Sequence, residues 1–279
     1  MKTAYPGYTG NGDGIGKREL LVVSFGTSYN DDRERTIGGI EQALEKEFGS
    51  EYAVRRGFTS GKITKLLKSR DNIVIDDVRE ALERAADNGV KTLAVQPTHL
   101  MEGSEYQKMC AEIEKHAAAF DQVAVGKPLL SSWQDEKEVM EAVIQATAED
   151  DDGDTAVCLM GHGTEALSNQ VYTNMQELLS ENGYKNYFVG TVEAEPALED
   201  VLAQVKKGSY SRVVLRPFMI VAGDHANNDM AGDEAGSWQS AFAEAGYEVK
   251  CIVEGLGQLP AIQAVFVRHA KEAVSSLKE

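Results

Sequence analysis

Three residues that can bind a metal ion, His162, Glu193 and His225, occur in the second half of the sequence. Each stands at or shortly after the end of a run of β-branched and apolar residues. Two imidazoles and one carboxylate suit a borderline divalent ion such as Co²⁺, Fe²⁺, Ni²⁺ or Zn²⁺. Imidazole also exchanges protons near neutral pH, so the same residues can move protons. We therefore interpret them as candidate metal ligands and catalytic residues.

The spacing of these residues is long, with 31 and 32 positions between successive members. No local motif such as HExxH joins them, so spacing alone leaves open that each is a capping or loop residue. The argument for one shared site comes from the strands that precede them. Carboxyl ends of parallel strands open on a common crevice, and ligands of open α/β sheets bind there.

The first half of the chain carries hydroxyl groups, glycines and a basic stretch at the corresponding strand ends. Backbone N–H groups at helix N-termini bind anions, and lysine pairs with carboxylates, so we expect these positions to bind substrate. For Lys65 and Lys68, farther along the basic stretch, a solvated helix face is the favoured interpretation. The predicted substrate-binding residues are Ser24, Gly26, Thr27, Ser28, Thr59, Ser60, Lys62 and His99.

Apolar stretches of strand length alternate with amphipathic stretches of helix length, which predicts an α/β fold with parallel sheets. The expected strands are residues 19–25, 52–58, 91–97, 122–125, 155–160, 187–192, 212–215 and 248–253. The expected helices are residues 33–48, 62–67, 75–88, 103–119, 135–148 and 260–277.

The two halves are similar in pattern, since Gly26 matches Gly163 and the stretch 97–103 matches 217–223. We expect two similar Rossmann-like domains, with parallel sheets that face a central cleft. The predicted divisions are a flexible leader (1–16), an N-terminal domain (17–148), a C-terminal domain with the metal site (149–256), and a C-terminal helix (257–279) that packs back on the N-terminal domain.

Composition excludes several classes of function. The net charge of −17 would repel nucleic-acid phosphates. No apolar run reaches the length of about 18 residues that a membrane span needs. The first 16 residues lack the apolar core of a signal peptide, which favours a cytoplasmic protein. Neither a GxxxxGK[ST] nor a GxGxxG motif is found, so no nucleotide or organic cofactor is expected. The sequence leaves open whether the chain forms a homo-oligomer.

Several longer blocks carry a resemblance to a known family. From about Leu20 onwards the chain resembles the anaerobic sirohydrochlorin cobaltochelatases, the class II chelatase family of cobalamin biosynthesis. The resemblance implies two Rossmann-like domains with the tetrapyrrole between them, and metal ligands at His162, Glu193 and His225. Glu195 departs from the family pattern as an extra acidic residue. The blocks are residues 21–29, 58–61, 160–163, 192–193 with Pro196, 221–230 and 255–262.

This resemblance implies insertion of Co²⁺ into sirohydrochlorin with release of two protons and without ATP. Co²⁺ is then a substrate, and the partners are a divalent metal and a tetrapyrrole. Two alternatives remain at this stage. One is a ferrochelatase-like activity, or insertion of nickel or iron into a tetrapyrrole, because the ligand types do not separate these metals. The other is a carrier that binds metal or tetrapyrrole without turnover.

Overall fold

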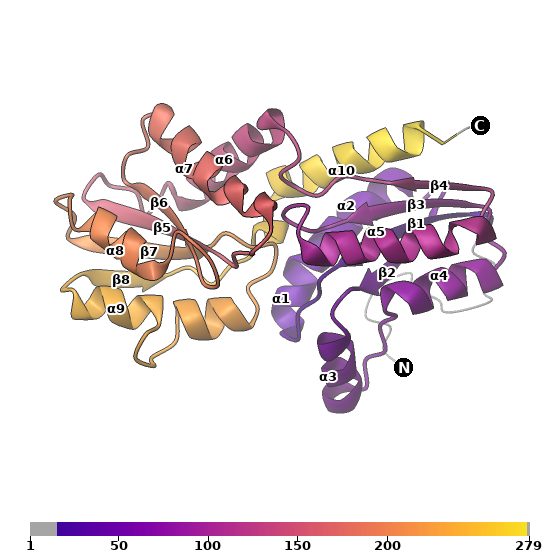
Figure 1. Cartoon of the computed structure of the whole chain (residues 1–279), viewed down its shortest axis with the longest axis horizontal. Coiled ribbons are helices and arrows are strands. Elements are labelled where there is room, and N and C mark those ends of the chain that lie inside the picture. Colours follow the sequence, from indigo (N-terminus) through magenta and orange to yellow (C-terminus); the bar gives the residue numbers. More distant parts are fainter. Residues whose placement is uncertain (1–15, 278–279) are drawn as a thin grey trace. The chain divides into compact units, whose positions relative to one another are not determined.

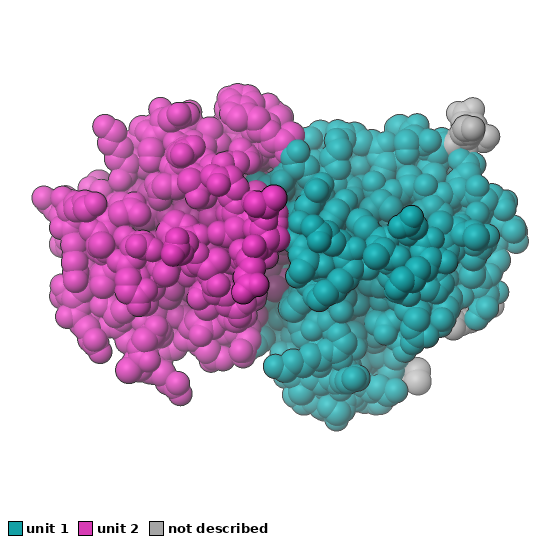
Figure 2. Space-filling view, in the orientation of Figure 1, with its two compact units in different colours: residues 1–131, 263–279 teal, residues 132–262 magenta. Residues whose placement is uncertain are grey.

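The computed structural model describes residues 16–277, which form two compact units (Figures 1 and 2). The first unit runs to Ser131 and resumes at Gln263, and the second holds the residues between. Apart from Gly16, the expected flexible leader lies outside the described residues. None of the helices in the described range is long and apolar enough to cross a membrane.

The first unit contains a four-stranded parallel sheet in the order β2-β1-β3-β4. The parallel registers of neighbouring strands place the ends of β1, β2 and β3 at one edge of the sheet. Its strands are β1 (Arg18–Ser24), β2 (Ala53–Phe58), β3 (Thr92–Pro97) and β4 (Gln122–Val125). Its helices are α1 (Asn30–Arg35), α2 (Ile37–Phe48), α3 (Gly61–Asp71), α4 (Val78–Asp87), α5 (Ser104–His116) with the 3₁₀ turn η1 (Ala117–Ala119), and most of α10 (Pro260–Ser275).

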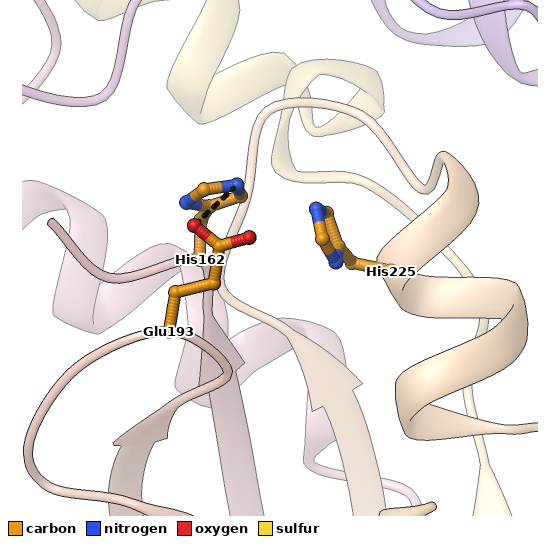
Figure 3. Close-up of side chains that lie close together, drawn as sticks. All are labelled: His162, Glu193 and His225. Atoms are coloured by element: carbon orange, nitrogen blue, oxygen red, sulfur yellow. Dashed lines mark ion pairs between the residues drawn. The ribbon is translucent and has the colours of Figure 1, made fainter. Parts of the chain in front are cut away.

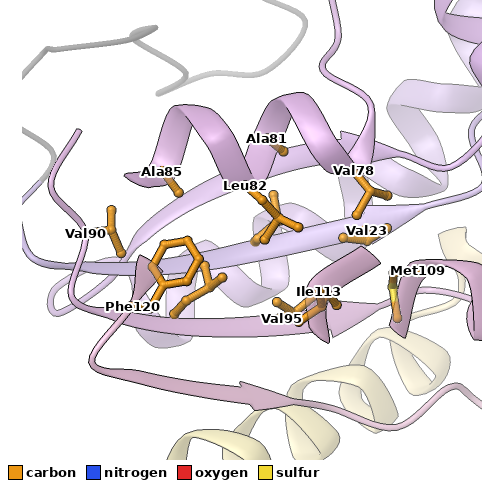
Figure 4. Close-up of a cluster of buried hydrophobic side chains, with 12 residues drawn as sticks. Val23, Val78, Ala81, Leu82, Ala85, Val90, Val95, Met109, Ile113 and Phe120 are labelled. Carbon is orange, nitrogen blue, oxygen red and sulfur yellow. The ribbon is translucent and has the colours of Figure 1, made fainter. Parts of the chain in front are cut away.

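The core of this unit follows from the alternation of side chains along its strands. Leu21 and Val23 of β1 point to one face, where α4 and α5 cover them (Figure 4). Leu20 and Val22 alternate with them and are fully buried on the opposite face, where α2 contacts β1 and β2. Both faces are therefore apolar, as expected of a parallel sheet covered by helices.

The second unit repeats this architecture with a sheet in the order β6-β5-β7-β8, again entirely parallel. Its core includes residues of β5, β6 and β7 packed against α8 and α9. Its strands are β5 (Thr155–Gly161), β6 (Tyr187–Thr191), β7 (Arg212–Pro217) and β8 (Glu248–Cys251). Its helices are α6 (Trp133–Thr147), α7 (Gln170–Glu181), α8 (Leu198–Val205) and α9 (Trp238–Glu244), with the short turns η2 (Leu167–Asn169), η3 (Ala226–Met230) and η4 (Leu256–Gln258).

The predicted fold class is confirmed, since both units are α/β with parallel sheets of the same strand order. One predicted helix differs. Residues 33–48 form parts of two helices that meet at Thr36, whose hydroxyl donates to the Asp32 carbonyl at 2.6 Å. Two glycines follow at positions 38 and 39, and glycine is a poor helix former, so the break is not resisted by local propensity.

The units also divide at a different place from the boundary expected at 148/149. Helix α6 belongs to the second unit, because Thr147 hydrogen-bonds Tyr187 of β6 at 2.7 Å and Glu136 accepts from Asn174 of α7 at 3.2 Å. Helix α10 is tied to the first unit. Its buried His269 lies 3.2 Å from the Lys127 carbonyl.

Candidate metal centre

The loops that follow β5, β6 and β7 bring His162, Glu193 and His225 together within the second unit (Figure 3). Each residue offers one ligand atom, and these atoms all lie within 4.8 Å of one another. His162 Nε2 is 3.7 Å from a Glu193 carboxylate oxygen. The two imidazole rings meet edge to face, with centroids 4.6 Å apart and an interplanar angle of 89°. Residues more than 60 positions apart in the chain thus form one cluster.

A backbone contact fixes which nitrogen of His162 can bind a metal. Its Nδ1 lies 2.8 Å from the Gly163 carbonyl oxygen, which can only accept a hydrogen bond. Nδ1 therefore carries the proton, and in the neutral ring Nε2 keeps its lone pair. Nε2 is also the nitrogen that lies near Glu193.

In His225, a carboxylate likewise determines which ring nitrogen carries the proton. Its Nδ1 is 2.8 Å from Asp229 Oδ2, so Nδ1–H donates to Asp229 and Nε2 is left as the ligand atom. Such carboxylate–histidine pairs fix the ring orientation and raise the basicity of metal-binding imidazoles. Asp229 lies on the π-helical turn η3, which begins directly after His225 and is anchored by the fully buried Ala226 and Met230.

Backbone contacts hold the first two ligands beside each other. The Glu193 amide donates to the His162 carbonyl at 2.9 Å, which joins the loop after β5 to the loop after β6. Gly163 makes this approach feasible, because its φ is +89° and an added Cβ would lie 2.8 Å from the Ala194 nitrogen. Asn169 adds a second link, accepting from the Thr164 amide at 2.9 Å and donating to the Glu195 carbonyl at 2.7 Å.

The three ligand side chains are partly solvent-exposed, unlike the buried cysteines and histidines of a closed structural site. Three protein ligands leave coordination positions open for water or an incoming ligand. The cluster therefore has the composition and access of a site that takes up and releases a metal ion. Glu195 is exposed and is not part of the cluster.

In the first unit, several predicted substrate-binding hydroxyls already have partners inside the protein. Ser24 and Thr27 are buried; Ser24 accepts from the Thr98 hydroxyl at 2.7 Å, and Thr27 accepts from the Tyr29 amide at 3.3 Å. Gly26 lies between them with φ +103°, and an added Cβ would contact the Phe58 ring at 2.6 Å. These three residues shape the turn after β1. The turn can therefore contact a ligand through its backbone groups.

The start of α3 carries the remaining hydroxyls and the predicted lysine. Ser60 caps the helix by accepting from the Ile63 amide at 3.4 Å, and the Thr59 hydroxyl has no hydrogen-bond partner among the described residues. Ser28 accepts from Arg70 through its carbonyl. Lys62 is exposed in the first turn of α3.

His99 stands two residues beyond β3, and neither of its ring nitrogens has a hydrogen-bond partner within residues 16–277. Both nitrogens are enclosed by protein atoms, and the Tyr106 ring packs edge-on at 6.3 Å. Burial lowers the pKa of His99 to about 4, while the nearby Glu105 acts weakly in the opposite direction. The imidazole is therefore neutral and offers both a donor and an acceptor.

Asp229 is a candidate positioning residue that the sequence analysis did not identify. The signal was its position four residues after His225, since side chains three or four apart on a helical segment are neighbours. Asn169 gave no comparable signal, because its role depends on contacts between two loops.

Comparisons with known proteins show what the whole chain is similar to. The family described as cobalt chelatase (CbiK) matches residues 18–275. The chain is 36% identical to the sirohydrochlorin cobaltochelatase of Salmonella typhimurium, over 94% of this chain and 98% of that protein. It is 27% identical to the sirohydrochlorin cobaltochelatase CbiKC of Nitratidesulfovibrio vulgaris, over 94% of this chain and 93% of that protein. SirB from Bacillus subtilis, solved with Fe³⁺, shares the fold with a TM-score of 0.66 at 16% identity, covering 94% of this chain and 97% of its own.

Proposed function

We propose, from the premise that this chain belongs to the cobalt chelatase (CbiK) family, that it inserts Co²⁺ into sirohydrochlorin. The observation that carries the proposal is the cluster of His162, Glu193 and His225, with Nε2 of both imidazoles left free to bind a metal. Imidazole nitrogen and carboxylate oxygen are suitable ligands for Co²⁺. The ion is a substrate here, so the site must release it as well as bind it.

Binding of the ion begins with the exchange of water for protein ligands. Nε2 of His162 and Nε2 of His225 supply two donors, and the Glu193 carboxylate supplies a third. The carboxylate also offsets one of the two positive charges of the ion. Because three ligands leave positions open, the nitrogens of the tetrapyrrole can enter before the protein ligands depart.

Insertion then exchanges one metal ion for two protons. The macrocycle loses two N–H protons and gains Co²⁺, so its charge is unchanged by the exchange. When Co²⁺ leaves Nε2 of each histidine, the freed lone pair accepts one of these protons. His162 and His225 thus act first as ligands and then as bases, and Glu193 relays protons to solvent. The reaction as written needs no nucleotide and no organic cofactor.

The tetrapyrrole carboxylates bind to groups of the first unit. The candidates are the exposed Lys62 at the start of α3 and the backbone around the half-buried Ser28 and Ser60 and the exposed Gly61. Ser24, Gly26 and Thr27 contribute through the shape and backbone of their turn. Thr59 and the neutral His99 have hydrogen-bonding atoms without partners among the described residues, but these atoms are enclosed by protein, so neither side chain offers a polar group to the substrate in this structure.

Insertion kinetics with Co²⁺, Fe²⁺ and Ni²⁺ test this function, with sirohydrochlorin and protoporphyrin compared side by side. The absorbance of the macrocycle reports metal incorporation directly. We expect multiple turnovers with Co²⁺ and sirohydrochlorin and little incorporation into protoporphyrin. Preferred insertion of iron or nickel would reassign the metal. Binding of metal and macrocycle without a change in absorbance would instead make the protein a carrier.

A further inference from the structure

Helix α3 is weakly packed against the rest of the first unit. Leu67 is the only one of its 11 residues that is buried, and the helix projects from the sheet and from α4 (Figure 1). Its C-terminal end is held by Arg70, which donates to the Ser28 carbonyl, and by Asp71, which accepts from Asn30. Most of its surface is thus available for contact with another molecule.

Three lysines form a row along the exposed side of this helix. Lys62, Lys65 and Lys68 are three residues apart, so they are neighbours on successive turns. Within residues 16–277 none of the three has a hydrogen bond or an ion pair through its side chain. Five other lysines of the same unit pair with carboxylates, in the pairs Lys91–Asp121, Lys108–Glu105, Lys115–Glu112, Lys127–Glu272 and Lys271–Glu47.

This arrangement is unfavourable for the helix by itself. Like charges at such spacing repel, and a cation in the first turn faces the positive end of the helix dipole. The first turn of α3 contains no acidic residue to offset Lys62. A bound polyanion would remove both penalties. The chain has 45 acidic and 28 basic residues, so its overall electrostatic field repels anions. The row of lysines is a local exception to this field.

Two exposed apolar residues lie near the N-terminal part of α3. Leu66 is 41% exposed and lies four residues from Lys62, so the two are neighbours on the helix. Phe25 is 46% exposed, and its carbonyl accepts from the Ser60 amide at the start of α3. The ligand that fits this surface combines several carboxylates with a flat apolar body.

We propose that Phe25, Lys62, Lys65, Leu66 and Lys68, here called the α3 surface, capture the tetrapyrrole substrate by its rim carboxylates and one apolar face. This inference rests on the proposed function, since sirohydrochlorin is a conjugated ring that bears several carboxylates. The α3 surface speeds association by attracting the macrocycle to an otherwise repelling protein. Electrostatic steering of this kind raises association rates by about 10-fold to 1000-fold and weakens as salt is added.

The test measures association of metal-free sirohydrochlorin by stopped-flow absorbance at several salt concentrations. The variant is Lys62→Gln/Lys65→Gln/Lys68→Gln, and the matched control is Lys185→Gln/Lys206→Gln/Lys207→Gln. The control lysines are exposed and likewise unpaired among the described residues, and both variants change the net charge by −3. Since all six side chains are exposed, folding should survive, which circular dichroism can verify.

At low salt we expect the α3 variant to associate at least about 10-fold more slowly than the wild type, with a much flatter salt dependence. The control should stay within about twofold of the wild type, and Co²⁺ titration should show an unchanged metal site in both. Leu66→Ala should speed dissociation without changing the salt dependence. Equal association rates for the two triple variants would overturn the proposal. This is also the result expected if the α3 surface docks an acidic protein instead of the tetrapyrrole. Failure of the wild type to insert Co²⁺ at all would instead overturn the proposed function.

Discussion

His225 Nδ1 and Asp229 Oδ2 lie 2.8 Å apart, across one turn of the π-helical segment η3. In the proposed mechanism this contact makes Asp229 a positioning residue, because it selects the tautomer in which His225 Nε2 can bind Co²⁺. Loss of such a carboxylate partner weakens metal binding by about 10-fold to 100-fold in comparable sites. The His162 side has no equivalent that mutation can remove, since its partner is the Gly163 carbonyl.

We therefore expect Asp229→Ala to weaken Co²⁺ binding by about 10-fold to 100-fold. Asp229→Asn should be affected less, because its side-chain oxygen can still accept from Nδ1–H. Long-range ¹H–¹⁵N spectra of the metal-free protein would show whether His225 keeps its proton on Nδ1. Asp224→Ala is the control, since it removes an exposed carboxylate next to His225 that contacts Asn228 instead of the ring. An unchanged affinity and tautomer in Asp229→Ala would remove the positioning role.

Replacing either of the two candidate metal-binding histidines tests the proposed centre itself. His162→Ala and His225→Ala should each lower the rate of cobalt insertion at least about 100-fold, an effect typical of losing a principal catalytic group. Both side chains are partly exposed, so the variants should fold. His116→Ala, on α5 of the first unit, serves as a matched control that should insert cobalt normally. Near-normal insertion by a site variant at saturating Co²⁺ would exclude that histidine from the mechanism.

The sequence predicted the strand ends well, because buried parallel strands are continuous apolar runs with clear limits. His162, Glu193 and His225 could be placed near one another on that basis alone. The sequence did not reveal in which direction the side chains at those strand ends point. Ser24 and Thr27 have the residue types of a binding site, yet both are buried and hydrogen-bonded inside the unit. Which imidazole nitrogen carries a proton also depends on contacts that no residue pattern shows.

The buried His99 leads to a prediction about stability and pH. Its pKa is about 4 in the folded protein and about 6.5 when exposed, so folding favours its neutral form. As pH falls below 6.5 the unfolded chain takes up a proton that the folded chain resists, and stability is lost until pH reaches about 4. His99→Gln removes this contribution. The drop in unfolding free energy between pH 7 and pH 5 should be smaller in His99→Gln than in the wild type, by about 1 to 2 kcal/mol.

Urea denaturation at the two pH values measures this difference, and comparison with the wild type cancels the groups that both proteins share. His116→Gln provides the control for a histidine that is partly exposed. If His99→Gln and the wild type lose the same stability on acidification, His99 takes up its proton in the folded state as readily as in the unfolded state.

The last prediction concerns a division of labour between the two units. Glu193 belongs to the proposed metal centre of the second unit, and Lys62 to the α3 surface of the first. Glu193→Gln keeps the shape of the side chain but removes the negative charge that offsets Co²⁺. It should weaken metal binding and leave binding of metal-free sirohydrochlorin nearly unchanged. Lys62→Ala should do the reverse, raising the apparent KM for the tetrapyrrole more than it lowers kcat, because a charge-assisted contact with a carboxylate is lost.

Separate titrations of each variant with Co²⁺ and with metal-free sirohydrochlorin decide the matter. The division fails if Glu193→Gln abolishes tetrapyrrole binding, or if Lys62→Ala removes metal binding. A small effect of Lys62→Ala alone is compatible with the division, since Lys65, Lys68 and the backbone amides at the start of α3 still offer partners to the carboxylates. In that case the triple lysine variant must show the loss in tetrapyrrole binding with an unchanged affinity for Co²⁺.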